Sequence, residues 1–192
     1  MKLRKHEITL CGEKVTLRPM TEDDWDILLK WNSNPDVLYF AEGDDVSAYT
    51  LDQIQQIYRG ILQKALCFII EVESKPIGDC WLQQMNLQRI LEKHPGADCR
   101  RIDLMIGEKE WWGRGLGTQV IHLLTQFAFE RENADFVFGC DIGNHNPASL
   151  RAFQKVGYQV ETRVEQLQGG KAHTRFDLVL SREQWAKAIE KR

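Results

Sequence analysis

The 192-residue sequence has no long hydrophobic run, no closely spaced pair of cysteines and no excess of basic residues. No stretch approaches the roughly 18 apolar residues of a membrane helix. The basic start at residues 1–7 has no apolar core behind it, so we expect neither a membrane span nor a signal peptide. The five cysteines lack a Cys-x-x-Cys pair, which argues against structural zinc and a disulfide framework and favours reduced thiols in a cytoplasmic protein. A formal net charge of −3 provides no general basic field for nucleic acid.

No repeat, low-complexity tract or linker divides the chain. A chain of this length buries about 70% of its unfolded surface. Its apolar fraction of 43% and charged fraction of 28% are ordinary for a globular protein. The sequence therefore predicts one domain that covers residues 1–192.

The chain is organised around a glycine-rich stretch, Glu-Trp-Trp-Gly-Arg-Gly-Leu-Gly-Thr, at residues 110–118. An apolar segment at 101–106 predicts a strand before it, and apolar residues at helical spacing predict a helix through Arg131. Glycine lets the backbone approach a ligand, and the free N–H groups of a first helical turn attract an anion. Arg114 adds a positive charge, so the stretch favours binding of a pyrophosphate.

Several interpretations of these glycines compete. A plain loop-to-helix turn would use the same residues. The stretch lacks the Gly-Lys-Ser/Thr ending of a P-loop, because Gly117 is followed by Thr118 and Gln119. A dinucleotide-binding fingerprint would have glycine where Val120 stands. Binding of an acyl-CoA remains, and it has a second test further along the chain.

That test is the segment at 144–158, in which Asn146 precedes Pro147 and a helical stretch ends at Gly157-Tyr158. With the glycine stretch, it resembles the GCN5-related N-acetyltransferase (GNAT) superfamily. The resemblance implies acetyl-CoA as cosubstrate and no metal, although Trp112 stands where the family usually has Arg or Gln. The cofactor-binding residues that it implies are Met105, Ile106, Trp112, Gly113, Arg114, Gly115, Leu116, Gly117, Thr118, Asn146, Ser149, Phe153 and Lys155.

The remaining elements follow from capping and periodicity. Helices are predicted after Thr21, Thr50 and Ser181, each followed three residues later by Asp or Gln in a capping box, and over 116–131 and 146–156. Residues 36–40 form a short aromatic segment of the core or of a binding wall, and 86–98 a loop that could cover the site. The predicted strands are 14–20, 66–72, 77–85, 99–107, 135–141, 158–167 and 172–180. This order, with the resemblance, implies a single-domain GNAT-like α/β fold with a mixed, mainly antiparallel sheet flanked by helices.

Asp103 is the candidate for catalysis, because a carboxylate within an apolar strand is costly to bury without a partner or a task. Two interpretations stay open. Asp103 pairs with Arg100 or Arg101 or faces solvent, or it acts as a general base that takes the proton of an amine. The histidines are scattered, and no cluster with metal-ligand spacing occurs.

Within the superfamily the chain resembles the aminoglycoside 6′-N-acetyltransferases along most of its length. The matching segments are 28–31, 37–38, 76–78, 102–108, 112–118 and 146–155. The resemblance implies Asp103 as base, Asp141 as a ligand of the polycationic drug, and Phe40 as a lining residue, and we add Trp81 as a candidate substrate contact. Phe153 departs from the family, which often has a tyrosine there that could protonate the leaving thiolate. Further carboxylates that could attract a polycation are Glu42, Asp44, Asp45 and Asp79.

These observations predict an acetyl-CoA-dependent N-acetyltransferase for a small polycationic amine, most simply the 6′-amine of aminoglycosides, with antibiotic resistance as its role. We expect a monomer or homodimer, without nucleic-acid or membrane partners. Two alternatives stay open: a GNAT enzyme that acetylates another amine (a protein N-terminus, a polyamine or a siderophore precursor), and a CoA-binding module that has lost catalysis.

Overall fold

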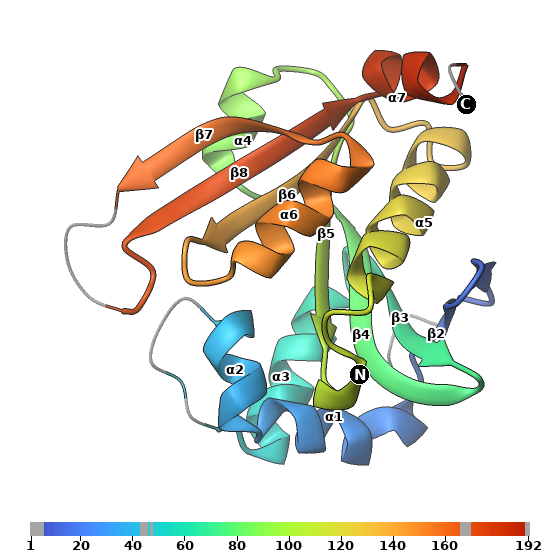
Figure 1. Ribbon diagram of the computed structural model, residues 1–192, viewed down its shortest axis with the longest axis vertical. Coiled ribbons are helices and arrows are strands. Elements are labelled where there is room, and N and C mark those ends of the chain that lie inside the picture. Colours follow the sequence, from blue (N-terminus) through green and yellow to red (C-terminus); the bar gives the residue numbers. More distant parts are fainter. Residues whose placement is uncertain (1–5, 43–45, 47, 166–169, 191–192) are drawn as a thin grey trace.

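The computed structural model describes residues 6–42, 46, 48–165 and 170–190, and a single twisted sheet runs through this part of the chain (Figure 1). Its strand order is β1-β2-β3-β4-β5-β6-β8-β7, with β5 and β6 as the parallel pair and antiparallel pairing elsewhere. The predicted mixed, mainly antiparallel α/β fold is therefore confirmed. The strands are β1 Leu10–Cys11, β2 Thr16–Pro19, β3 Ala65–Val72, β4 Lys75–Gln84, β5 Cys99–Ile106, β6 Phe136–Gly143, β7 Gln159–Glu165 and β8 Thr174–Ser181.

The helices predicted from capping signals begin at those residues, the first of them as a 3₁₀ turn after Thr21. The side chains of Thr21, Thr50 and Ser181 each close a capping box, and the Asn146 side chain accepts a hydrogen bond from the backbone N–H of Ser149. No helix among the described residues is long and apolar enough to cross a membrane. The helices are α1 Trp25–Asn32, α2 Pro35–Ala41, α3 Leu51–Ile61, α4 Gln88–Lys93, α5 Leu116–Glu130, α6 Pro147–Val156 and α7 Arg182–Ile189, with 3₁₀ turns η1 Glu22–Asp24 and η2 Lys109–Trp111.

Three segments differ from the prediction, the shortest being the two-residue strand β1, which the sequence did not reveal. Residues 36–40 belong to α2, because the Asn34 side chain caps the Asp36 N–H and Pro35 occupies the first helical turn, so the proline starts a helix as well as ending the previous one. The supposed loop at 86–98 contains the short helix α4, which lacks a side-chain cap and so gave no capping signal. The acidic turn and the final hairpin fall partly outside the described residues, at 43–45 and 168–169.

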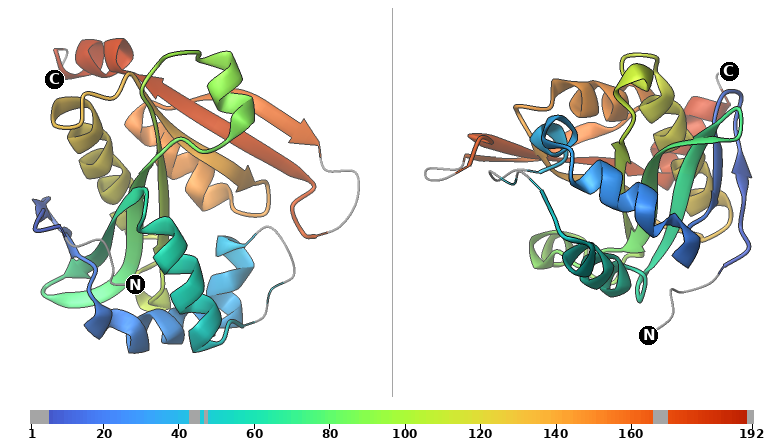
Figure 2. Two further views of the ribbon diagram at one scale, coloured as in Figure 1. Left: turned by 180° about the vertical axis from the view of Figure 1, so that it is seen from behind. Right: turned by 90° about the horizontal axis from the view of Figure 1, so that it is seen from below.

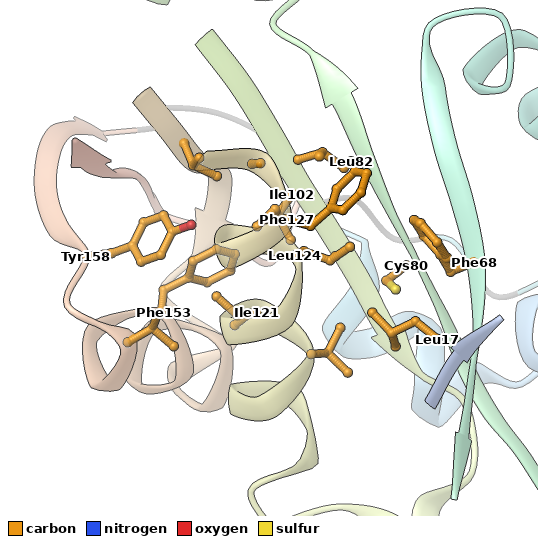
Figure 3. Packing of buried hydrophobic residues seen from close by; sticks show 14 of the residues in the cluster. Leu17, Phe68, Cys80, Leu82, Ile102, Ile121, Leu124, Phe127, Phe153 and Tyr158 are labelled. Atoms are coloured by element: carbon orange, nitrogen blue, oxygen red, sulfur yellow. The ribbon is translucent and has the colours of Figure 1, made fainter. Parts of the chain in front are cut away.

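Helices cover both faces of the sheet. In Figure 1 the near face carries α5 and α6, and the left panel of Figure 2 shows the opposite face with α3 and α4. Alternate residues of the strands pack on the two sides: Phe68 and Ile102 join the α5 core, whereas Cys67 and Ile69 join the core beneath α1 and α3. Figure 3 shows the α5 core, with Phe153 of α6 close to Tyr158 and Ile121.

The two parallel strands separate part-way along their length. Pairing of β5 with β6 covers only Cys99–Arg101 against Phe136–Phe138, so residues 102–106 and 139–143 have no ladder bonds to each other. The carboxyl ends of parallel strands lie at the same edge of a sheet. The separation therefore opens a gap in the middle of the sheet, at the ends that carry Asp103 and Asp141.

Candidate active site

The larger of two neighbouring cavities has a volume of about 390 Å³ and lies beside the end of β5, between α2, the glycine stretch and α6. Most of the predicted cofactor-binding residues line it. It is lined by Val37, Phe40, Ala41, Leu104, Met105, Ile106, Trp111, Trp112, Gly113, Gly115, Leu116, Gly117, Thr118, Ile121, Asn146, Ala148, Ser149, Arg151, Ala152 and Lys155.

The glycine stretch forms one wall of this cavity with backbone rather than side chains. Gly113 and Gly115 have φ angles of 73° and 77°, the left-handed region that favours glycine. Gly115 is the N-cap of α5, and no side chain of the described residues caps this helix. The amides of the first turn are therefore free to bind an anion at the positive end of the helix dipole. Gly117 does not have a left-handed φ angle. A Cβ added there would contact only the Leu104 side chain, at an ordinary distance of 3.5 Å.

Aromatic side chains hold the stretch against the strand and against α2. The indole Nε1 of Trp112 donates to the Ile106 carbonyl at 2.7 Å, and the Phe40 ring packs edge-on against Trp112 with centroids 5.5 Å apart. Arg114 lies over the ring of Trp111, 4.8 Å from its centroid, and its side chain is outside the cavity wall. The predicted cation of the stretch therefore faces an aromatic ring and does not line the cavity.

Helix α6 supplies the opposite wall. The Asn146 amide donates to the Phe40 carbonyl at 3.0 Å, which ties this helix to α2. Lys155 and Arg151 bring positive charge to the cavity, and Arg151 was not foreseen from the sequence. Phe153 points the other way: it is 2% exposed, and a Cβ added at Gly139 would lie 2.6 Å from its ring. Phe153 therefore belongs to the core, outside the lining of either cavity.

The smaller cavity, of about 100 Å³, lies in the gap between β5 and β6 and contains both predicted carboxylates, Asp103 and Asp141. Glu42 and His145 also line it, and burial lowers the pKa of His145. It shares five lining residues with the larger cavity: Phe40, Ala41, Leu104, Asn146 and Ser149.

Asp103 forms an ion pair and also lines the smaller cavity. Arg101 Nη2 donates to its Oδ1 at 2.7 Å, so the ion pair exists, yet the same carboxylate lines the smaller cavity. Burial raises the pKa of Asp103, and Arg101 only partly offsets this effect. Trp81 occupies the position directly opposite on β4 but lies outside the lining of both cavities.

Asp141 stands at an irregularity of β6, where the register with β8 shifts between Gly139 and Ile142, and its φ angle is 55°. Its Oδ1 accepts a hydrogen bond of 2.7 Å from Arg89 Nη2, and its backbone N–H donates to Asp177 Oδ1 at 3.0 Å. The sequence did not reveal Arg89, because it belongs to the segment that we interpreted as a loop.

Asp79, a further predicted candidate, is fully buried and lines neither cavity. The Tyr58 hydroxyl donates to its Oδ2 at 2.9 Å, and burial raises the pKa of Asp79 to about 7. Among the described residues, no group of three or more His, Cys, Asp or Glu side chains is arranged to hold a metal ion.

Three features define the geometry of this site: a helix start without a side-chain cap, a strand that leads into it, and a parallel partner strand that diverges from that strand. A model of the acetyltransferase (GNAT) domain matches residues 14–159. The chain belongs to the GNAT acetyltransferase family. The sequence-based prediction of the family and of an N-acetyltransferase is thereby confirmed.

Individual relatives of this GNAT acetyltransferase are distant. It is 24% identical over 165 residues to an aminoglycoside N(6′)-acetyltransferase type 1 of Klebsiella pneumoniae, covering 79% of this chain and 77% of the relative. Among solved structures, AAC(6′)-Ib in complex with ribostamycin and coenzyme A matches with a TM-score of 0.75 at 22% identity, over 91% of this chain and 97% of the other. A spermidine N-acetyltransferase of Vibrio cholerae with CoA and spermine matches with a TM-score of 0.72 at 15% identity, over 91% and 99%.

Proposed function

We propose that this GNAT acetyltransferase transfers the acetyl group of acetyl-CoA to a primary amine of a small polycation, with the 6′-amine of an aminoglycoside as the first candidate. The observation that carries the proposal is the junction of the two cavities. Five shared residues connect a wall suited to phosphate with a pocket that is lined by the half-buried carboxylate of Asp103. Transfer between two bound substrates needs such a connection, because their reacting atoms must meet.

Acetyl-CoA would occupy the larger cavity, whose walls supply backbone amides and positive charge. The free amides at the start of α5, with the left-handed Gly113 and Gly115, would hold the pyrophosphate, and Lys155 and Arg151 would add positive charge. Asn146 and Ser149 at the junction would contact the pantetheine arm. Trp112 would act by fixing the stretch to the end of β5, in place of the family's usual Arg or Gln.

Asp103 would act as the base. The amine must lose a proton as its nitrogen attacks the thioester carbon, and a carboxylate whose pKa is raised by burial accepts that proton more readily near neutral pH. Beyond Arg101, the edge of β5 that faces β6 has no ladder partner. The Gly107 N–H bonds to the Ile77 carbonyl on the β4 side, so by strand alternation the Ile106 N–H lies on the β6 side and would stabilise the oxyanion. Phe153 cannot donate a proton, so the thiolate would leave unassisted or take its proton from water.

The preference for a polycation has separate support. Asp103, Asp141 and Glu42 line the smaller cavity, and carboxylates attract multiply charged amines. Two similar structures hold ribostamycin and spermine, which are polyamines of different shape. Acetylation of a linear polyamine is therefore the second candidate, favoured by the likeness to the spermidine N-acetyltransferase.

A panel of amines distinguishes these possibilities. Release of CoA would be measured with kanamycin, spermidine, a peptide with a free N-terminus and a simple monoamine, and NMR would locate the acetyl group on the product. We expect the highest kcat/KM with kanamycin and acetylation of the 6′-amine. A higher value with spermidine or the peptide would contradict the aminoglycoside assignment. Tight CoA binding without release from any amine would instead indicate a non-catalytic module.

Three further properties belong to this proposal. The continuous sheet supports one domain over residues 1–192. All five cysteines are unpaired thiols, and four are buried, which agrees with the predicted cytoplasmic location. A monomeric or homodimeric state and the lack of metal and nucleic-acid partners remain predictions from the sequence.

A further inference from the structure

Charges of alternating sign run from the far side of the gap to the proposed base. Asp177 of β8, Arg89 of α4, Asp141 of β6, and Arg101 and Asp103 of β5 follow one another. The distances are 2.9 Å for Asp177–Arg89, 2.7 Å for Arg89–Asp141, 4.0 Å for Asp141–Arg101 and 2.7 Å for Arg101–Asp103. Asp103 and Asp141, two of the carboxylates that line the smaller cavity, are therefore each paired with a guanidinium.

The bond between Arg89 and Asp177 is the anchor of this series. Arg89 donates from Nε and Nη2 to the two oxygens of Asp177, both at 2.9 Å, and the Asp177 side chain is only 3% exposed. Such a bidentate ion pair is geometrically specific and strong. By contrast, Arg89 reaches Asp141 with one nitrogen, and the side chains of Arg89 and Asp141 are 38% and 32% exposed. The contact with Asp141 is thus the one that an incoming ligand can replace.

We propose that Arg89 determines substrate specificity by serving as an internal counter-ion for Asp141. Its guanidinium holds the position at Asp141 that a second ammonium group of a polycationic acceptor would take. When such an acceptor binds, its ammonium replaces Nη2 at Asp141, and Arg89 stays attached to Asp177. This inference rests on the proposed amine acetyltransfer and names the residue that sets how strongly the site favours multiply charged acceptors.

The direction of the effect follows from competition. A polycation gains the attraction of Asp141 only after it displaces a bound cation, so Arg89 reduces the advantage of a polycation over a monoamine. A monoamine needs only Asp103, whose ion-pair partner is Arg101. It therefore does not compete with Arg89. Removing Arg89 should therefore improve the binding of polycations and leave monoamines unchanged.

The variant must not leave Asp177 buried without a partner, because an isolated buried charge strongly destabilises a protein. We therefore combine Arg89→Met with Asp177→Asn, since the Asn oxygen can still accept the hydrogen bond from the Asp141 backbone N–H. A matched control combines Arg18→Met with Asp24→Asn, which removes another bidentate ion pair, with bonds of 2.7 and 3.0 Å, from residues that line neither cavity. Both double variants keep the net charge of the chain.

KM and kcat would be measured for spermidine and for a monoamine at low and moderate salt. We expect the Arg89/Asp177 variant to lower KM for spermidine roughly tenfold at low salt, with monoamine values unchanged. The Arg18/Asp24 variant should shift neither. Equal changes in KM for both amines, or a higher KM for spermidine, would overturn the proposal. The Arg89 network would then have a structural role only.

A binding measurement separates this proposal from the proposed function. If no amine is acetylated, the proposed function fails, and spermine binding to the CoA complex can still be measured by calorimetry. Tighter spermine binding by the Arg89/Asp177 variant than by the natural sequence would support the counter-ion role. Equal or weaker binding would refute it.

Discussion

Asp79 provides a test of the electrostatics of this fold that does not depend on the reaction. Its side chain is fully buried on β4, the Tyr58 hydroxyl donates to Oδ2, and Oδ1 has no partner among the described residues. Burial disfavours the charged form, and the Tyr58 hydrogen bond offsets this only in part, so the pKa of Asp79 rises from 3.8 to about 7.

The sign of the pH effect follows from proton binding. Between pH 4 and 7 the folded state keeps a proton on Asp79 that the unfolded chain has lost, so the free energy of unfolding falls as pH rises through this range. A rise of about 3 pKa units corresponds to about 4 kcal/mol of stability, which is fully present below pH 4 and lost above pH 7.

Asp79→Asn removes this titration. Asparagine can still accept the Tyr58 hydrogen bond, but its buried amide costs about 1–3 kcal/mol if it finds no acceptor, equally at every pH. The informative quantity is therefore the stability of the variant minus that of the natural sequence, measured by urea unfolding at several pH values. We expect this difference to become more favourable to the variant by about 4 kcal/mol between pH 4 and pH 8.

Asp23→Asn, at an exposed position in the turn before α1, serves as control. Its stability relative to the natural sequence should not show the gain of about 4 kcal/mol between pH 4 and pH 8 that is expected for Asp79→Asn. A difference for Asp79→Asn that is flat from pH 4 to pH 8 would refute the reasoning. Asp79 would then be ionised in the folded protein, with a stabilising partner other than Tyr58.

Three further predictions concern the site. Gly115→Val should weaken acetyl-CoA binding at least tenfold, about 1.4 kcal/mol, because valine is strained at the φ angle of 77°. If calorimetry gave equal affinities for the two proteins, the glycine stretch would be only a turn and not a cofactor-binding element. Asp103→Asn should lower kcat by roughly 10²–10⁴ with acetyl-CoA binding retained, and because burial raises the pKa of Asp103, the acidic limb of kcat/KM should lie above the ordinary carboxylate range. A normal kcat per folded site, with only a lower melting temperature, would leave Asp103 the structural partner of Arg101. Asp141→Asn should raise KM for an aminoglycoside far more than for a monoamine, and equal changes would contradict its contact with the drug.

The sequence by itself determined the local elements whose signals lie within a few residues. Thr21, Thr50 and Ser181 started helices as predicted, because a capping box is satisfied by residues three positions apart. The helix start after Gly115 followed from its place between an apolar strand and an apolar helical face, because glycine adopts the left-handed backbone conformation more readily than other residues. The resemblance of this stretch and of the segment after Asn146 also led to the family.

Only the tertiary structure decided how distant residues meet. Asp103 and Asp141 face one cavity because β5 and β6 stop pairing after Arg101 and Phe138, a long-range event without a local signal. The side chain of Phe153 turned into the core because Gly139, on another strand, leaves room for its ring. The pairing of Arg89 with Asp141 and Asp177 depends on a short helix packed across two strands. Local sequence sets backbone preference, whereas side-chain partners and burial depend on which strands and helices come to lie beside one another.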